Sequence, residues 1–220
     1  MMRGSDSMKK VVYRVKEIQL HKDAPTVREK AVWEGLDTPG LTACNLYNAA
    51  LFVELSHCTA TTKETTGEPL TTWEQEIEDN IAKFDIHFLS YLHLHRYMAG
   101  TKNPDYCNLP AQARNSTLKQ AAEDFQDCLY AWGSPNCLFK DGRSNVVLSS
   151  KECKIREEAG VHFLDLSLPN CSFSLCLGKT PVRGFLSQVE ATFEDDTITL
   201  KLILADMVED DAEDWEGSED

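Results

Sequence analysis

The stretch Val11–Leu20, VVYRVKEIQL, is rich in β-branched and aromatic residues and predicts a β-strand near the start of the chain. The residues after it, up to Trp132, show mostly helical spacing, and patterns with a period near two return only after Gly142. One strand therefore precedes a block of helices, and several strands follow it. This order predicts an α+β fold, in which a helical insertion interrupts a small β-barrel and Val11–Leu20 pairs with strands from the C-terminal third.

Two helices are predicted in the first part of the insertion. The first begins at Pro25-Thr26 and ends at a group of turn-forming residues, Asp37-Thr38-Pro39-Gly40. The second covers Leu41–Thr59, and a polar loop, Thr59–Glu68, follows it.

Two more helices complete the insertion. Thr72 caps the third helix, and Gln75 completes its capping box. That helix bends and continues through His87–Met98. Pro110 suits the first turn of the fourth helix, which ends near Trp132.

The last third of the chain predicts short strands separated by turns. Acidic residues Glu194-Asp195-Asp196 mark a hairpin turn between the last two strands. The six predicted strands are Val146–Leu148, Cys153–Arg156, Val161–Leu168, Ser172–Leu177, Phe185–Phe193 and Thr197–Leu204.

Length and charge limit the class of protein. The 220 residues allow one or two domains, and 42% hydrophobic with 26% charged residues is typical of a soluble globular chain. The net charge is −14, and nine acids without a base lie in Asp206–Asp220. Without this tail, 22 basic residues stand against 27 acidic ones, a net charge of −5. We expect the tail to be disordered, and the acidic body is unusual for a protein that grips nucleic acid.

No targeting signal is visible in the sequence. No apolar run approaches the roughly 18 residues of a membrane span, and the N-terminus lacks the apolar segment of a signal peptide. Eight scattered cysteines without a C-x-x-C pair favour reduced thiols that mostly fill the core. We therefore expect a cytoplasmic protein that does not bind a membrane.

Four segments in order resemble a known family. They are CNLYNAAL at Cys44–Leu51, LPAQ at Leu109–Gln112 opening an amphipathic helix, the polar strand-like Ser144–Ile155, and the final strand Thr197–Leu204 before the acidic tail. This order resembles the N-terminal half of TnpB-type transposon proteins and of miniature type V CRISPR effectors. In that family a RuvC-like nuclease built on three spaced carboxylates follows, whereas this sequence continues with Asp206–Asp220 alone.

The resemblance implies a domain organisation. The family has an oligonucleotide-binding-like wedge barrel whose first strand is N-terminal, and a helical recognition lobe is inserted before the barrel is completed. Applied here, residues 1–10 form a flexible start, residues 11–24 and 133–205 the wedge-like barrel, residues 25–132 the recognition-like insertion, and residues 206–220 the disordered tail.

No set of residues in the sequence predicts catalysis. His93 and His95 are two residues apart, which places them on different sides of a helix. The neighbours His57-Cys58 do not face each other on a helix, and paired acids such as Asp195-Asp196 and Asp210-Asp211 fall in a turn and in the tail. We predict that the chain is not an enzyme, has no metal ligands and needs no cofactor.

The resemblance points instead to residues that contact nucleic acid. By position they are Trp73, Gln112, Asn115, Ser149 and Ser150, with Lys140 and Arg143 where the family has a denser basic stretch. Gln and Asn can pair bidentately with adenine, and an aromatic ring can stack or touch a thymine methyl. In the alternative interpretation Trp73 belongs to the core, Gln112 and Asn115 to a solvated helix face, and Ser149-Ser150 to a turn.

Three functions follow from these observations. The first is a non-catalytic component or regulator of an RNA-guided, TnpB-like or type V CRISPR-like DNA-targeting system, which binds guide RNA, target DNA or the effector complex. The second is an acidic inhibitor or decoy that docks on a nuclease. The third is an accessory subunit of a split nuclease. We favour the first, and the sequence assigns no oligomeric state.

Overall fold

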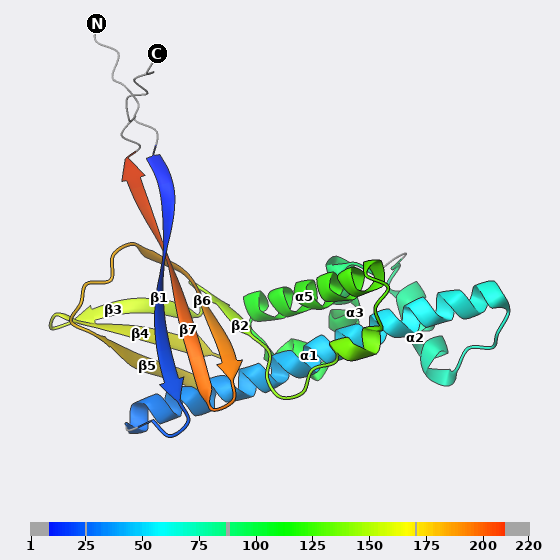
Figure 1. The fold of residues 1–220 in the computed structure, drawn as a ribbon, viewed down its shortest axis with the longest axis horizontal. Helices are drawn as coiled ribbons and strands as arrows, with labels where there is room; N and C mark the ends of the chain where they lie inside the picture. The colour runs from blue at the N-terminus through cyan, green and yellow to red at the C-terminus, as the bar shows by residue number, and fades with distance from the viewer. Residues whose placement is uncertain (1–8, 25, 87–88, 170, 210–220) are drawn as a thin grey trace, which may run out of the picture.

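The computed structural model describes residues 9–24, 26–86, 89–169 and 171–209. The fold is α+β: the strands gather at one end of the molecule, the helices at the other, and one long helix runs under both (Figure 1). The helices are α1 (Val27–Thr66), α2 (Thr72–Lys83), α3 (Tyr91–Gly100), α4 (Pro104–Asn108), α5 (Ala111–Tyr130) and the 3₁₀ helix η1 (Pro135–Leu138).

The strands form two antiparallel sheets. One has the order β1-β7-β6-β2 and the other the order β3-β4-β5. Their bounds are β1 (Lys9–His21), β2 (Val146–Ser149), β3 (Cys153–Glu158), β4 (Val161–Leu168), β5 (Cys171–Gly178), β6 (Phe185–Glu194) and β7 (Thr197–Glu209).

The first strand pairs with the last, which confirms the predicted link between the two ends of the chain. β1 lies antiparallel to β7 along its whole length, from Lys9 opposite Glu209 to His21 opposite Thr197. The predicted hairpin is also confirmed, because β6 and β7 are joined through Asp195 and Asp196, and Asp195 has a φ of 47°.

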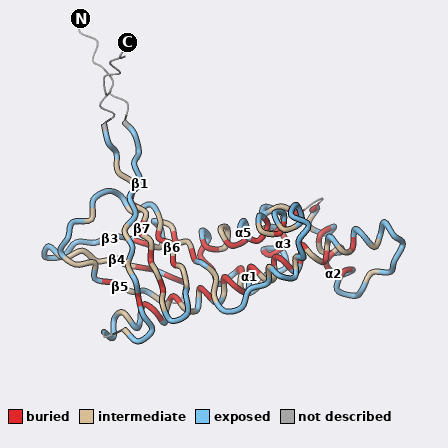
Figure 2. The backbone as a smooth tube through the Cα atoms, viewed as in Figure 1, coloured by how far each residue is buried: buried red, intermediate tan, exposed pale blue. Residues whose placement is uncertain are grey.

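The expectation of a closed barrel is wrong. Within the described residues the seven strands divide into sheets of four and three, and neither sheet closes on itself. The turn after β2 passes the chain from one sheet to the other, and the buried side chains of both sheets join the helices in one core. Figure 2 shows buried segments that recur along α1 and along the strands of both sheets.

The predicted helix break at residues 37–40 is also wrong, because α1 runs through it. Pro39 lies inside the helix and lacks the N–H of the helical hydrogen bond. Two contacts hold the segment in place: Asp37 forms an ion pair with Arg143, and the ring of Phe193 packs against Gly40, leaving no room for a side chain there. Tertiary contacts here override the local preference for a turn.

The predicted polar loop at residues 59–68 is mostly helix. α1 continues to Thr66, and Gly67 ends it with a φ of 76°. The threonine hydroxyls of this segment donate to carbonyls of the preceding turn, as Thr62 does to Cys58 O at 2.9 Å. Each hydroxyl is satisfied within the helix, so a threonine-rich sequence can remain helical.

The next helices differ from prediction in their bounds. The capping box of α2 is Thr71 with Glu74, one residue before the predicted pair, and Lys63 of α1 lies 2.7 Å from the Glu74 carboxylate. α2 then ends at Lys83, and α3 begins as a separate helix at Tyr91. The short elements α4 and η1 were not predicted.

The acidic segment 206–220 has two parts. Asp206–Glu209 belongs to β7, so the prediction that the tail begins at Asp206 is wrong. The prediction of disorder for 210–220 lies outside the described residues. The cysteines also differ from expectation: Cys44 and Cys153 are buried, while the other six are partly or fully exposed.

Candidate functional site at the junction of helices and sheet

A pocket opens where the helices meet the four-stranded sheet. The first turns of α5 contact β2, and α1 passes beneath both (Figure 1). The pocket has a volume of about 470 Å³. Polar side chains dominate its lining, which consists of Tyr47, Ser116, Thr117, Gln120, Lys140, Ser144, Asn145, Val147, Glu190 and Thr192.

Two buried hydroxyl groups in this lining have no hydrogen-bond partner. Thr117 on α5 is only 5% exposed, and its Oγ1 atom is unpaired. Ser144, in the loop before β2, has an unpaired Oγ atom that is also shielded from solvent. Because a buried polar atom without a partner is costly, these two hydroxyls offer hydrogen bonds to a molecule that enters the pocket.

A hydrogen-bonded network forms one wall of the pocket. The hydroxyl of Tyr47 donates to Oδ2 of Asp124 at 2.6 Å, and the amide of Gln120 donates to Oδ1 of the same carboxylate at 2.6 Å. Burial, followed by this hydrogen bond, raises the pKa of Tyr47 above its ordinary value. The tyrosine therefore presents a neutral hydroxyl and an immobilised ring to the pocket.

Lys140, in the pocket lining, lies beside Tyr47 and Asp124, and the carboxylate of Asp124 offsets its positive charge. Its Nζ atom lies 3.8 Å from the centre of the Tyr47 ring and 3.7 Å from Oδ2 of Asp124. Its backbone N–H donates to Oδ1 of Asn48 at 2.9 Å, and its carbonyl accepts from Nδ2 of Asn48 at 2.7 Å. Asn48 of the CNLYNAAL motif thus fixes the loop that carries Lys140.

Arg143 also has a structural partner. Its guanidinium is paired with Asp37 and lies 5.5 Å from the centre of the Trp33 ring. The adjacent Ser144 N–H donates to Gly40 O at 3.0 Å. Loop 139–145 is therefore held against α1 by Lys140, Arg143 and Ser144. The positive charges of Lys140 and Arg143 are offset by Asp124 and Asp37.

Gln112 and Asn115 lie at the start of α5, near the pocket but outside its lining. Gln112 is exposed. Oδ1 of Asn115 is buried beside a cluster in which Nε2 of His95 lies 2.8 Å from the Tyr106 hydroxyl and Arg114 lies over the Tyr106 ring. Burial, and then the charge of Arg114, lower the pKa of His95, so this histidine favours its neutral form.

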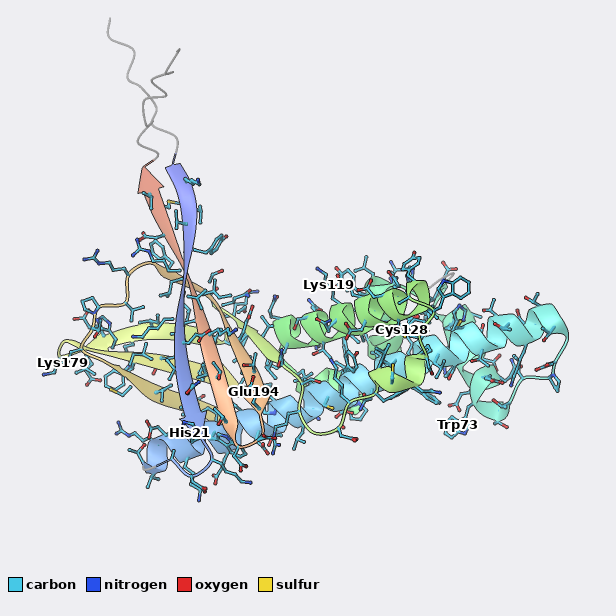
Figure 3. The ribbon with its side chains drawn as sticks, in the orientation of Figure 1. His21, Trp73, Lys119, Cys128, Lys179 and Glu194 are labelled. Carbon is cyan, nitrogen blue, oxygen red and sulfur yellow. The ribbon has the colours of Figure 1, made fainter. Side chains whose placement is uncertain are left out.

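The remaining predicted residues are more distant from one another. Ser149 ends β2 and its N–H donates to Oε2 of Glu152 at 2.9 Å, while Ser150 is exposed in the turn that follows. Trp73 is 66% exposed on α2, at the far end of the helices from the sheets (Figure 3). The structure therefore brings α5, which carries Gln112 and Asn115, into contact with β2, and leaves Trp73 apart.

Sequence reasoning missed most of the pocket lining. Tyr47 lies inside the quoted CNLYNAAL motif, so that motif was a usable signal. Thr117 precedes Leu118 of the predicted apolar stripe, and nothing in a single sequence marks it as a polar group facing a pocket.

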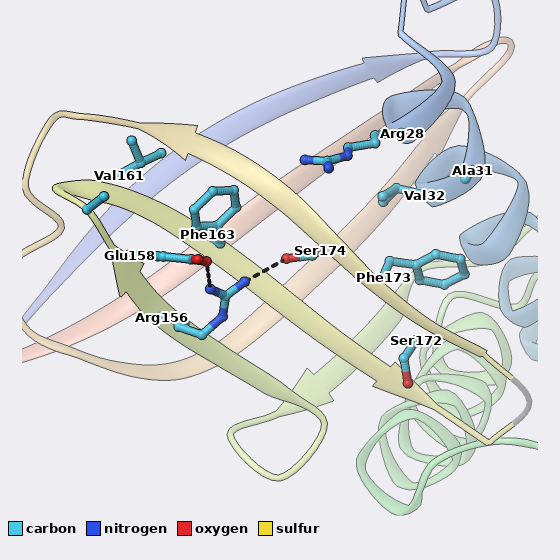
Figure 4. A pocket seen from close by; sticks show the side chains of 11 residues that line it. Arg28, Ala31, Val32, Arg156, Glu158, Val161, Phe163, Ser172, Phe173 and Ser174 are labelled. Atoms are coloured by element: carbon cyan, nitrogen blue, oxygen red, sulfur yellow. Dashed lines mark hydrogen bonds and ion pairs between the residues drawn. The ribbon is translucent and has the colours of Figure 1, made fainter.

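A second pocket, of about 620 Å³, lies between the start of α1 and the three-stranded sheet (Figure 4). Arg28 extends over it from α1, and Arg156 stands over the Phe163 ring at 4.9 Å. Arg156 is also bound to Glu158 and Asp165, with Nε 3.0 Å from Oδ2 of Asp165. Two carboxylates offset its charge, so this pocket offers weaker anion binding than its arginines suggest.

Two further histidines, His57 and His93, have protein partners. Nδ1 of His57 lies 2.6 Å from Glu78, and Nδ1 of His93 lies 2.7 Å from Ser90. His87 lies outside the described residues. Throughout the described ranges, no group of three or more His, Cys, Asp or Glu side chains is arranged to hold a metal ion.

Comparison with known proteins identifies no family. No protein-family model matches the chain, and no curated protein matches it. None of the helices in the described ranges is long and apolar enough to cross a membrane.

Proposed function

We propose that the chain is a non-catalytic nucleic-acid-binding component of an RNA-guided, TnpB-like or type V CRISPR-like DNA-targeting system. The pocket between α5, α1 and the four-stranded sheet, called here the junction pocket, is the site that contacts an exposed base edge. The observation that carries the proposal is the pair of unpartnered hydroxyls, Thr117 and Ser144, which border one pocket together with amide groups. Hydroxyl and amide groups are the usual partners of base edges.

The charge distribution supports base contacts over phosphate contacts. Lys140 is the one basic residue in the described lining, and Asp124 and Glu190 stand close by. A group that is planar, neutral and rich in hydrogen-bonding atoms fits this environment better than an anion does. Phosphate contacts would then come from other parts of the surface, and the affinity would depend on salt.

The proposal is tested by binding of nucleic acids to the full chain. Fluorescence anisotropy would measure the dissociation constants for random-sequence pools of single-stranded RNA, single-stranded DNA and duplex DNA, at two salt concentrations. We expect Asn145→Ala and Thr117→Val to weaken binding of the preferred pool about tenfold, equivalent to about 1.4 kcal/mol. Gln75→Ala, on the remote helix α2, is the matched control and should change binding less than about twofold.

Two results would contradict the proposal. One is the absence of binding to all three pools at low salt. The other is equal loss of affinity in the pocket variants and in Gln75→Ala, which would mean that the pocket has no part in binding.

The acidic balance favours a second candidate, an inhibitor or decoy that docks on a nuclease. The net charge is −14, and carboxylates accompany Lys140, Arg143 and Arg156. An acidic protein of this kind would bind the basic surface of a nuclease. Failure to bind nucleic acid, together with inhibition of a purified type V nuclease, would favour this candidate.

A further inference from the structure

Half of the β1–β7 ribbon extends beyond the body of the protein (Figures 1 and 2). Every residue from Lys10 to Val15 is exposed. β1 is also the edge strand of its sheet, and among the described residues β7 is the only strand that pairs with it. The outward row of backbone N–H and C=O groups on β1 is therefore available to another strand.

The projecting ribbon carries an exposed apolar face. Tyr13 and Phe185 are both directly opposite Ala205, one on each side, so their rings share a face of the sheet. Tyr13 is 64% exposed and Phe185 is 78% exposed. Val11, Val15 and Met207 lie on the same face by strand alternation and are also exposed. A contiguous apolar surface of this kind marks an interaction site.

The other face of β1 is basic. It carries Lys10, Arg14 and Lys16, with the exposed Val12 between Lys10 and Arg14, although the chain as a whole carries a charge of −14. Arg14 lies 3.6 Å from Asp206 of β7. The strand that already pairs with β1 has this pattern. In β7, Asp206 lies on the same face as the basic residues of β1, and its neighbours Ala205 and Met207 lie on the apolar face.

We propose that the outer edge of β1 receives an extended segment of a partner protein in which apolar and acidic residues alternate. Such a strand would form main-chain hydrogen bonds with β1. Its apolar side chains would cover Tyr13 and Val15, and its acidic side chains would face Lys10 and Lys16. This protein-binding edge is separate from the junction pocket and does not depend on the function proposed for it.

Charge and geometry argue against two other partners for this edge, a second copy of the chain and a nucleic acid. A second copy of the chain would place Lys10, Arg14 and Lys16 of two β1 strands close together, and like charges on paired strands are destabilising. A nucleic acid would leave the backbone groups of the edge without partners. A strand with acidic side chains would pair with the basic side chains of β1 and would also form hydrogen bonds with its backbone N–H and C=O groups.

The test uses two defined peptides of seven residues, one alternating Glu and Val and one alternating Lys and Val. Fluorescence anisotropy would measure their binding to the full chain, and hydrogen exchange would follow the amides of residues 10–15. We expect the acidic peptide to bind at least about tenfold more tightly than the basic one and to slow the exchange of these amides. The double variant Lys10→Glu/Lys16→Glu should reverse the preference.

The control is Lys151→Glu/Lys154→Glu, which changes the net charge by the same amount on exposed residues of the β2–β3 region. It should retain the preference for the acidic peptide. The proposal is overturned if neither peptide binds, if both bind equally, or if the control also reverses the preference. It is equally overturned if the amides of residues 10–15 become protected through dimerisation without peptide, or if a 20-nucleotide RNA or DNA displaces the peptide.

Discussion

The ring of Phe173 in β5 occupies the space that a side chain on Gly35 of α1 would fill. A similar contact, between Phe193 of β6 and Gly40, lies just over one helical turn further along α1, where the ring comes within 2.7 Å of the position of a Cβ atom. These two glycines let α1 approach both sheets closely, and they attach the helical half of the chain to strands of each sheet.

Gly35→Ala should therefore destabilise the fold. An alanine in a helix is normally more stable than a glycine by roughly 1 kcal/mol, but here the methyl group would collide with the Phe173 ring. We expect a net loss of about 1–3 kcal/mol in the free energy of unfolding, measured by urea denaturation. The double variant Gly35→Ala/Phe173→Leu should lose less than the sum of the two single variants. A higher stability of Gly35→Ala would show that the ring can move aside.

Thr117→Val should raise stability while it weakens nucleic-acid binding. The variant replaces a buried, unpaired hydroxyl with a methyl group of similar size, which removes a cost of about 1 kcal/mol or more. Thr62→Val is the matched control, because the Thr62 hydroxyl already donates to Cys58 O. Thermal denaturation should show a higher Tm for Thr117→Val alone. A lower Tm would indicate that the Thr117 hydroxyl has a partner in solution.

Glu54 should make stability depend on pH near neutrality. This residue of α1 is 6% exposed, and burial raises its pKa from 4.5 to about 7. Because the folded pKa lies above the unfolded one, the protonated carboxyl favours the fold fully below pH 4.5, and that contribution is lost as the pH rises through 7. Glu54→Gln should therefore gain stability relative to the wild type between about pH 5 and pH 8, by up to about 3 kcal/mol.

Urea denaturation at a series of pH values measures this gain. Glu64→Gln, at an exposed position of the same helix, is the control for the loss of one negative charge. A flat profile for Glu54→Gln would mean that the carboxylate of Glu54 is solvated in the native state.

Removal of residues 210–220 should tighten nucleic-acid binding without loss of stability. The deletion removes seven acidic residues and changes the net charge from −14 to −7, while β7 keeps its full length to Glu209. We expect a Tm within about 2 °C of the full chain, and stronger binding that is most evident at low salt. Truncation at Ala205 would be a different experiment, because it removes four residues that pair with β1. Unchanged affinity at both salt concentrations would leave the acidic segment without an electrostatic role.

The purified chain should not cleave RNA or DNA in the presence of Mg²⁺ or Mn²⁺. The reason is that the sequence lacks the set of spaced carboxylates that holds the metal ions of RuvC-like nucleases. Gel electrophoresis of labelled substrates provides the measurement. Cleavage that persists through purification and disappears when a carboxylate of this chain is replaced would refute the prediction.

The strands were more predictable than the helices, for physical reasons. β-branched residues mark β1, β2 and β7 directly, and the alternation in Val161–Leu168 or Thr197–Leu204 follows the buried face. The segment around Pro39 contains every local signal of a turn, yet contacts with Phe193 and Arg143 keep it helical. Those contacts connect residues about 100 or more positions apart, so no local pattern contains them.

The candidate site was harder to predict for the same reason. The resemblance led to residues of α5 and β2, and these two elements are in contact, but none of the residues that it named lines the pocket except Lys140. The chemistry of the pocket, however, depends on single polar residues such as Tyr47, Thr117 and Glu190, which come from three separate elements. A lone polar residue in each element produces no spacing that a sequence pattern can identify.

Because α1 is long, a small bend in the helix near Pro39 would produce a large displacement at its C-terminal end. The helix has 40 residues, a length of about 60 Å, and about 40 Å of it lies beyond Pro39. Proline is a frequent position of helix bending, because it removes one hydrogen bond of the helical ladder. A bend of about 10° at Pro39 would move Thr66, and with it the start of α2, by about 7 Å while the sheets stay in place. Such a bend would displace Trp73 together with α2, and the contacts of Asp37 with Arg143 and of Gly40 with Phe193 oppose it.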